Sequence, residues 1–338
     1  MECLGMTMTK AMNINFHSGR DDFIDRLFSY LTKKLPLEIL QLKQVRDNVF
    51  IVDTNKKSFI LKGYQNLSKL RIQQDLTASL IKAGFKETYH FYQFEDDPLF
   101  FENRYYGCIR YIAQNKRGFS YQSHVEREEG LQLLTDYHAT TEKLVSTYKG
   151  LIPYQNLLKK WRDRLQHFKM NRGIVNYYVP KEISSWLYET AEMALAGMEK
   201  HKGDFLNKTP VILHGDVAHH NFIRSRKNGL YLIDFDLVSI GPVSYDLLQY
   251  ANRILPFMKW SFDSLAKMKG FSDHIHDKAF LYGLMYPSDI FREWNRIIKL
   301  NSYYNPARVA PLMEMTVTQF KERKAFVENL NNEIISKK

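Results

Sequence analysis

The spacing of apolar residues along the first sixty positions predicts one helix followed by a sheet. Residues 18–34 carry Leu27 and Leu31 at helical spacing, and Pro36 follows as a stop signal. Beyond it, apolar residues recur at every second position, which is typical of half-buried strands. Polar turns separate three such strands, which we expect over residues 38–45, 48–53 and 58–63.

A second helix and a return to strands complete this region. Residues 67–83 have helical spacing and end at Gly84, a common helix stop. Alternating apolar residues then predict strands over 88–94 and 99–111. Because strands joined by short turns pair antiparallel, we expect a small antiparallel sheet with one helix between its strands.

From about residue 113 the pattern becomes helical. Long helices are predicted near 122–144, 153–170, 181–200 and 243–254, with four more segments before the C-terminus. Two short apolar strands interrupt them, at 210–213 and 230–233. The pattern favours an α+β fold with two lobes: a small sheet-rich N-terminal lobe over 14–109 and a large helical C-terminal lobe over 110–338.

Composition supports a soluble protein made in the cytoplasm. The 338 residues are 44% apolar and 25% charged, which is ordinary for a globular chain of this size. Two cysteines, Cys3 and Cys108, predict neither a disulfide nor a cysteine metal site. No signal-peptide stretch opens the chain, and no apolar run approaches the roughly 18 residues of a membrane span.

The chain is basic, with 48 lysines and arginines against 37 acids and a formal net charge of +11. This balance favours anionic partners such as nucleotide phosphates. A nucleic-acid-binding protein is one hypothesis, but net charge alone motivates it, because the basic residues are scattered and their longest clusters are pairs. We therefore expect no nucleic-acid partner. The charge also argues against a polycationic acceptor.

The most specific motif is His-Gly-Asp-Val-Ala-His-His-Asn over residues 214–221, directly after a short apolar strand. Phosphoryl transfer from ATP needs a carboxylate to accept the proton of the attacking hydroxyl and oxygen ligands for magnesium. Asp216 and Asn221, five residues apart, place both groups on one loop, as in the protein-kinase pattern H-R-D-x-x-x-x-N. Gly215 replaces the arginine. Such a motif arises by chance in roughly one chain in a thousand.

A second motif, Tyr-Leu-Ile-Asp-Phe-Asp over residues 231–236, follows at the end of the next short strand. A kinase fold needs its main magnesium ligand shortly after the catalytic loop, so Asp234 is the candidate. The three histidines at 214, 219 and 220 also suggest a metal cluster. No further histidine or cysteine spacing supports zinc there, and His214 is better explained as a brace of the loop.

These motifs resemble those of the aminoglycoside phosphotransferase and choline kinase superfamily, whose members have a protein-kinase-like fold. In that family the His-Gly-Asp loop is followed by Ile-Asp-Phe-Asp and then by Gly-Asp-Pro-x-x-Tyr-Asp-Leu. This chain has Ile233–Asp236 and then Gly241–Leu247, without the aspartate between the glycine and the proline. The resemblance implies that Asp246 steadies the catalytic loop. It also implies Lys62, at the end of the third strand, as the lysine that binds nucleotide phosphates.

Within the superfamily the chain most resembles the bacterial spore-coat kinase-like proteins of the CotS type. The similar segments are Ser58–Lys62, Leu134–His138 and Leu158–Trp161. The resemblance implies an ATP- and Mg²⁺-dependent small-molecule kinase, with Asp216 and Asn221 catalytic, Lys62, Asn221 and Asp234 binding the nucleotide, and Asn221 and Asp234 holding the metal. It further implies a role in sporulation, with spore-coat proteins as partners and the coat as the final location.

Two departures from the kinase pattern keep a second hypothesis open. Kinases hold the phosphate lysine with a helix glutamate, and Gln73 occupies the equivalent helix face here. The first hairpin, Val45–Val49, contains no glycine to approach phosphates closely. The alternative is therefore a catalytically weak or inactive kinase-fold protein that acts by interaction in the spore coat. The sequence does not identify the acceptor.

Overall fold

The computed structural model describes residues 18–94 and 97–336. These form two compact units: residues up to 78 together with 89–112, and 79–88 together with 113 onward. The start expected for the N-terminal lobe, residue 14, lies outside the described residues. Within the described ranges, none of the helices has the length and apolar character needed to cross a membrane.

The first unit is built on an antiparallel sheet in the order β1-β2-β3-β6-β4, with β5 also paired to β6. Its strands are β1 (Ile39–Arg46), β2 (Val49–Thr54), β3 (Ser58–Tyr64), β4 (Phe91–Tyr92), β5 (Leu99–Phe101) and β6 (Arg104–Arg110). Its helices are α1 (Ser18–Lys34) and α2 (Leu67–Lys82), whose last turn belongs to the second unit. The architecture matches the small antiparallel lobe that the pattern predicts.

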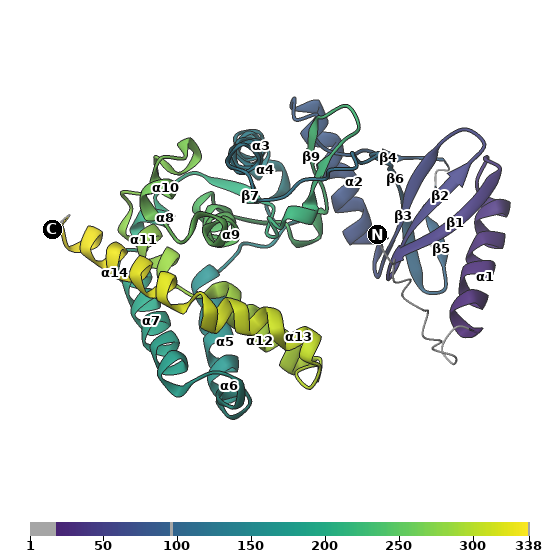
Figure 1. The fold of residues 1–338 in the computed structure, drawn as a ribbon. Helices are drawn as coiled ribbons and strands as arrows, with labels where there is room; N and C mark the ends of the chain where they lie inside the picture. Colours follow the sequence, from purple (N-terminus) through teal and green to yellow (C-terminus); the bar gives the residue numbers. More distant parts are fainter. Residues whose placement is uncertain (1–17, 95–96, 337–338) are drawn as a thin grey trace, which may run out of the picture. The chain divides into compact units, whose positions relative to one another are not determined.

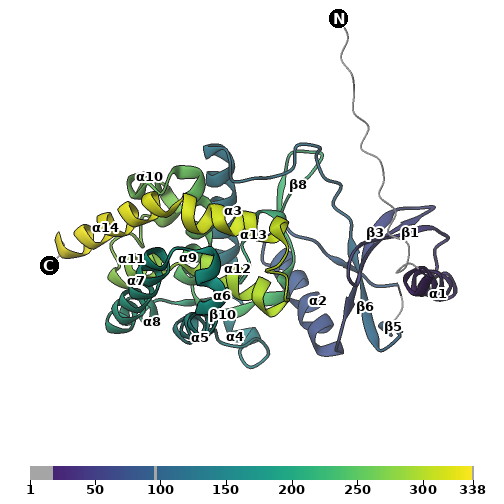
Figure 2. The same ribbon diagram turned by 60° about the horizontal axis from the view of Figure 1, so that its bottom comes forward.

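Helix α1 covers one face of this sheet (Figures 1 and 2). Leu27 and Leu31 of α1 are fully buried in one cluster with Phe59 and Leu61 of β3. Because side chains alternate between the two faces of a strand, Lys62 lies on the face opposite α1. The alternation that identifies β3 in the sequence thus directs the lysine away from the apolar core.

One predicted strand in this unit is wrong. The segment 99–111 forms two strands, β5 and β6, joined by a tight turn at Glu102 and Asn103. Both turn residues have left-handed backbones, with φ of 41° and 60°. Asparagine tolerates this conformation better than most residues, but the turn contains no glycine or proline and was therefore missed in the sequence.

The second unit is mainly helical. Its α-helices are α3 (His124–Glu142), α4 (Val145–Tyr148), α5 (Leu157–Met170), α6 (Arg172–Tyr178), α7 (Lys181–Lys200), α8 (Gly203–Leu206), α9 (Ser244–Ile254), α10 (Phe262–Ala266), α11 (Lys278–Met285), α12 (Ser288–Lys299), α13 (Pro306–Met313) and α14 (Phe320–Ser336). Shorter helical turns are η1 (His219–Asn221), η2 (Phe235–Leu237), η3 (Leu255–Met258), η4 (Lys269–Phe271) and η5 (Glu314–Thr318). The helical C-terminal lobe is thus also as expected.

Two short strand pairs lie among these helices and position the His214–Asn221 loop and the Asp234 segment. Strand β7 (Pro210–Leu213) pairs with β10 (Ser239–Pro242), and β8 (Phe222–Arg224) pairs with β9 (Leu230–Leu232). The segment before α5 is bound to β10, because Ile240 N–H donates to Pro153 O (2.8 Å) and Gln155 N–H donates to Ile240 O (2.9 Å). The N-terminal end of α5 is thereby held next to the strand pair from which the catalytic loop leaves.

Candidate active site

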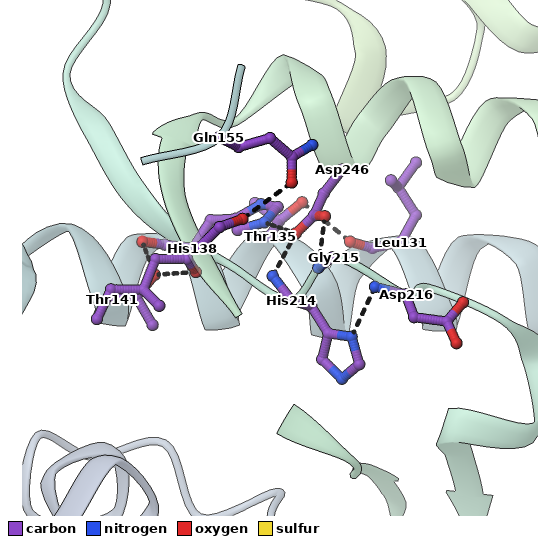
Figure 3. A network of polar contacts seen from close by, with 11 residues as sticks. Leu131, Thr135, His138, Thr141, Gln155, His214, Gly215, Asp216 and Asp246 are labelled. Carbon is purple, nitrogen blue, oxygen red and sulfur yellow. Dashed lines mark hydrogen bonds and ion pairs between the residues drawn. The ribbon is translucent and has the colours of Figure 1, made fainter. Parts of the chain in front are cut away.

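A buried carboxylate anchors the catalytic loop at its start. Asp246, in the first turn of α9, accepts hydrogen bonds from the backbone N–H groups of His214 (2.7 Å) and Gly215 (3.0 Å). Its Oδ2 also lies 2.9 Å from His138 Nε2 of α3 (Figure 3). Burial opposes ionisation of Asp246, but the His138 contact and the loop amides lower its pKa below the ordinary value. The role implied for Asp246 is confirmed.

His214 joins the loop to the segment that carries Asp234. Its Nδ1 accepts from the N–H of Asp216 (3.3 Å), which makes Nε2 the protonated nitrogen that donates to Ile233 O (2.9 Å). Burial lowers the pKa of His214, in keeping with a neutral ring. Because one ring nitrogen is bound within the loop and the other to the Asp234 segment, His214 braces the loop as expected.

Gly215 stands where no other residue fits. Its φ is +79°, in the left-handed region, and a Cβ atom there would lie 2.2 Å from the carbonyl oxygen of Leu237. A side chain would therefore meet rigid backbone in a conformation that L-residues avoid. This close approach explains why glycine precedes Asp216.

Asp216 and Asn221 lie in contact across the loop. The Asn221 side chain is buried, and its Nδ2 donates to Asp216 O at 2.7 Å. Because the nitrogen of the amide is bound to that carbonyl, a cation at this side chain would meet the amide oxygen. The Asp216 carboxylate is one-third exposed, and Arg253 Nη2 of α9 lies 3.3 Å from its Oδ1. Arg253 was not predicted, although it lies two helical turns after Asp246 on the same face of α9.

The β8–β9 hairpin brings Asn221 and Asp234 to one place. Asn221 precedes β8 and Ile233 follows β9, and Ile233 N–H donates to Asn221 O at 2.9 Å. Asp234 comes next, with a left-handed backbone at φ 70°. Such a conformation in a non-glycine residue is costly and is typical of functional sites. An amide oxygen and a carboxylate are hard ligands that suit Mg²⁺, so the residues present fit this ion.

The remaining predicted site residue, Lys62, lies in the first unit and is buried at the end of β3. Its Nζ is 5.5 Å from the ring centroid of Tyr64. The Tyr64 hydroxyl donates to Gln73 Oε1 (3.0 Å), and the Tyr89 hydroxyl donates to the same oxygen (3.4 Å). The amide at the predicted helix-glutamate position therefore binds two tyrosines, a pairing that sequence spacing does not reveal.

The chain belongs to the phosphotransferase enzyme family, because residues 112–280, half of its length, match the model of that family. The matched segment contains the whole catalytic loop and the Asp234 segment. A search of curated protein sequences found no match.

Solved structures of phosphotransferases have the same fold. An aminoglycoside phosphotransferase from Alicyclobacillus acidocaldarius superposes with a TM-score of 0.71 at 15% identity, over 90% of this chain and 95% of that one. A spectinomycin phosphotransferase in complex with ADP and spectinomycin gives 0.56 at 14% identity, over 90% and 97%. The choline kinase LicA from Streptococcus pneumoniae gives 0.50 at 15% identity, over 92% and 100%. These likenesses confirm the expected protein-kinase-like fold.

Proposed function

We propose that the protein is an ATP- and Mg²⁺-dependent phosphotransferase that acts on a hydroxyl group of a small-molecule acceptor. The observation that carries this proposal is the Asn221–Ile233 backbone hydrogen bond. It sets the Asn221 amide beside the Asp234 segment, five residues after Asp216. In this proposal a proton acceptor and two oxygen ligands for a metal come from one short stretch of structure, as phosphoryl transfer requires.

Each residue has a separate role in the proposed reaction. Asp216 orients the acceptor hydroxyl and accepts its proton, since its carboxylate is partly exposed and its backbone is fixed by His214 and Asn221. Asn221 and Asp234 would hold Mg²⁺, which neutralises charge on the phosphates when bound. Lys62 binds the nucleotide phosphates. The negatively charged phosphates of ATP suit a chain with a net charge of +11.

A second candidate function is a kinase-shaped interaction protein with weak or no turnover. Gln73 favours it, because a neutral amide already bound by two tyrosines cannot form the ion pair that holds a phosphate lysine. The first hairpin also turns at Asn48, without glycine. In this version the protein is made in the cytoplasm and deposited in the spore coat, with other coat proteins as partners. The similarity to CotS-type segments supports that setting.

Nucleotide-dependent thermal stabilisation tests the proposal before any acceptor is known. Ligand at about 100-fold excess over its Kd adds about 2.7 kcal/mol of stability, so Mg-ATP should raise the melting temperature. We expect the rise only when magnesium is present, and a smaller one for Asp234→Asn. The matched control is Asp263→Asn. Asp263 is exposed on α10, so this variant should behave as wild type. No shift at millimolar Mg-ATP would favour the interaction protein.

A further inference from the structure

Four basic side chains of the helical unit interact with one another, and two of them, Lys160 and Arg253, also interact with Asp216. They come from three helices: Lys160 and Arg164 from α5, Arg253 from α9 and Arg292 from α12. Lys160 and Arg164 are four residues apart and so lie on one face of α5. Arg253 is in direct contact with Asp216. All four are half-buried.

The packing of the helices holds this basic cluster together. Helix α12 is bound to α5 by a hydrogen bond from Asn295 Nδ2 to Arg164 O (2.9 Å). Tyr286 donates to Trp161 O (2.6 Å), and its ring stacks on the Trp161 indole at 4.3 Å between centroids. The backbone of α5 is therefore fixed against α12. The backbone positions of Lys160, Arg164 and Arg292 are therefore set by the packing of these helices.

The cluster carries more positive charge than its neighbours balance. Asp216 pairs with Arg253, and Glu293 is shared between Arg292 and Arg296. Across 18–94 and 97–336, no carboxylate lies within ion-pair distance of Lys160 or Arg164. The nearby Asp246 is already bound by the loop amides and His138.

Keeping this charge half-buried is costly for the folded protein. Burial lowers the pKa of Lys160, and the charges of Arg164 and Arg292 lower it further. Burial likewise lowers the pKa of Arg164 and of Arg253. Partly desolvated cations that repel one another favour an anionic ligand, which would supply the missing counter-charge.

We propose that the acceptor is an anion: a small hydroxyl compound whose phosphate or carboxylate group lies against the basic cluster. This inference rests on the proposed phosphotransferase function and assigns the substrate class of the same site. Guanidinium groups match the planar carboxylate and the phosphate with paired hydrogen bonds. An anionic acceptor is repelled by Asp216 and by the γ-phosphate of ATP, and the cluster offsets both. A polycationic acceptor such as an aminoglycoside would instead meet four like charges.

The transfer step balances without any further reactant. The acceptor oxygen bonds to the γ-phosphorus, and the bond from that phosphorus to the β–γ bridging oxygen breaks. ADP leaves with the bridging oxygen, and the hydroxyl proton goes to Asp216 and then to water. The product carries one more phosphate than the acceptor. The anionic group that the acceptor brought to the site is unchanged and still faces the cluster.

Binding of simple probes tests the anionic site without knowledge of the natural acceptor. Inorganic phosphate and D-glycerate, each titrated calorimetrically without magnesium, should bind, and the stronger probe distinguishes a phosphate from a carboxylate site. Lys160→Gln and Arg292→Gln should each weaken the stronger probe about tenfold, the effect of losing one charged hydrogen bond. Choline and kanamycin should not bind.

The matched controls are Lys159, next to Lys160, and Arg296, one helical turn after Arg292. Lys159, 70% exposed on α5, pairs with Asp163, and Arg296 is 60% exposed on α12. Lys159→Gln and Arg296→Gln should bind the anions as wild type does. Equal binding by all variants, no anion binding at all, or preferential binding of choline or kanamycin would overturn the inference.

Different results would overturn the phosphotransferase proposal and the anionic-acceptor proposal. Mg-ATP affinity is measured separately on the wild-type protein. Mg-ATP binding together with absent anion binding overturns the anionic acceptor and leaves the phosphotransferase standing. Absent Mg-ATP binding overturns the phosphotransferase, whatever the anions do.

Discussion

At the scale of single residues, Asp216 and Asp234 have the same side chain but different surroundings. The Asp216 carboxylate contacts Arg253 and is one-third exposed. Asp234 follows a buried strand with a left-handed backbone, next to the residue that is bound to Asn221. The first environment suits a group that meets an incoming hydroxyl, and the second suits a fixed metal ligand.

Replacing each aspartate by asparagine should therefore have separate effects. Asp234→Asn should weaken Mg-ATP binding strongly, because a divalent ion loses an anionic ligand. Asp216→Asn should retain Mg-ATP binding and abolish transfer, because an amide cannot accept the proton. Calorimetry on both variants measures this, with circular dichroism to confirm folding. Loss of nucleotide binding in Asp216→Asn alone would show that the roles are wrongly assigned.

Gly215→Ala should disrupt the loop and lower the melting temperature. The new Cβ would lie 2.2 Å from Leu237 O at a positive φ, which costs about 1–2 kcal/mol before the clash is counted. Gly173→Ala is the control, because its Cβ meets open space on α6 and should leave stability unchanged or raise it by about 0.5–1 kcal/mol. Thermal unfolding compares the two. Equal melting temperatures would contradict the loop geometry.

At the scale of elements, α2 carries Gln73 at the helix position predicted to hold Lys62 of β3. Gln73 of α2 is buried and accepts hydrogen bonds from Tyr64 and Tyr89, which are both donors. A carboxylate accepts hydrogen bonds more strongly than an amide oxygen does. The two tyrosines would therefore stabilise an anion at this position, even though the chain has a neutral residue there.

Gln73→Glu should consequently fold and should tighten Mg-ATP binding or raise basal ATP hydrolysis. The new charge would hold the Lys62 ammonium in one geometry. Gln74→Glu is the matched control, since the neighbouring residue lies 100° further around α2 and should not affect nucleotide binding. Binding is measured by calorimetry. If Gln73→Glu and Lys62→Ala both bind Mg-ATP as wild type does, Lys62 is not the phosphate lysine.

At the scale of the whole molecule, stability should depend on pH through a buried histidine. His274 packs against Phe280 at 5.5 Å between ring centroids, and its Nδ1 is 3.5 Å from Lys208 Nζ. Burial and the Lys208 charge lower the pKa of His274 to about 4. The folded protein thus keeps this ring neutral at pH values where the unfolded chain protonates it.

Because the unfolded state binds the extra proton, stability should fall as pH drops from about 6.5 towards 4. The largest loss from this one group is about 3 kcal/mol, and none is expected above pH 7. Urea denaturation at pH 7.0, 5.5 and 4.5 measures how the free energy of unfolding changes with pH. This dependence should be weaker in His274→Gln than in wild type. His124→Gln, at the exposed start of α3, is the control. An unchanged slope in His274→Gln would disprove the assignment.

The sequence alone predicts the parts of this protein that depend on local order. These parts depend on interactions between residues close in sequence. They are the strand alternation around Lys62, the turns of the long helices and the five-residue spacing of Asp216 and Asn221. Hydrogen bonding and side-chain direction at such distances follow from backbone geometry, so pattern and structure agree. The turn at Glu102 and Asn103 is one exception, because two non-glycine residues adopt left-handed backbones there, and the strand predicted over 88–94 is another, because it shortens to Phe91–Tyr92.

Only the tertiary structure decides which distant residues share the site. Lys160, Arg253 and Arg292 stand far apart in sequence, and each alone is one of 48 basic residues. Packing of α5 against α12 and the anchoring of α9 at the loop bring their charges close to one another, with Arg253 in contact with Asp216. Charge interactions depend on distance and burial rather than on sequence separation, so the basic cluster that motivates the proposed anionic acceptor is seen only in the folded chain.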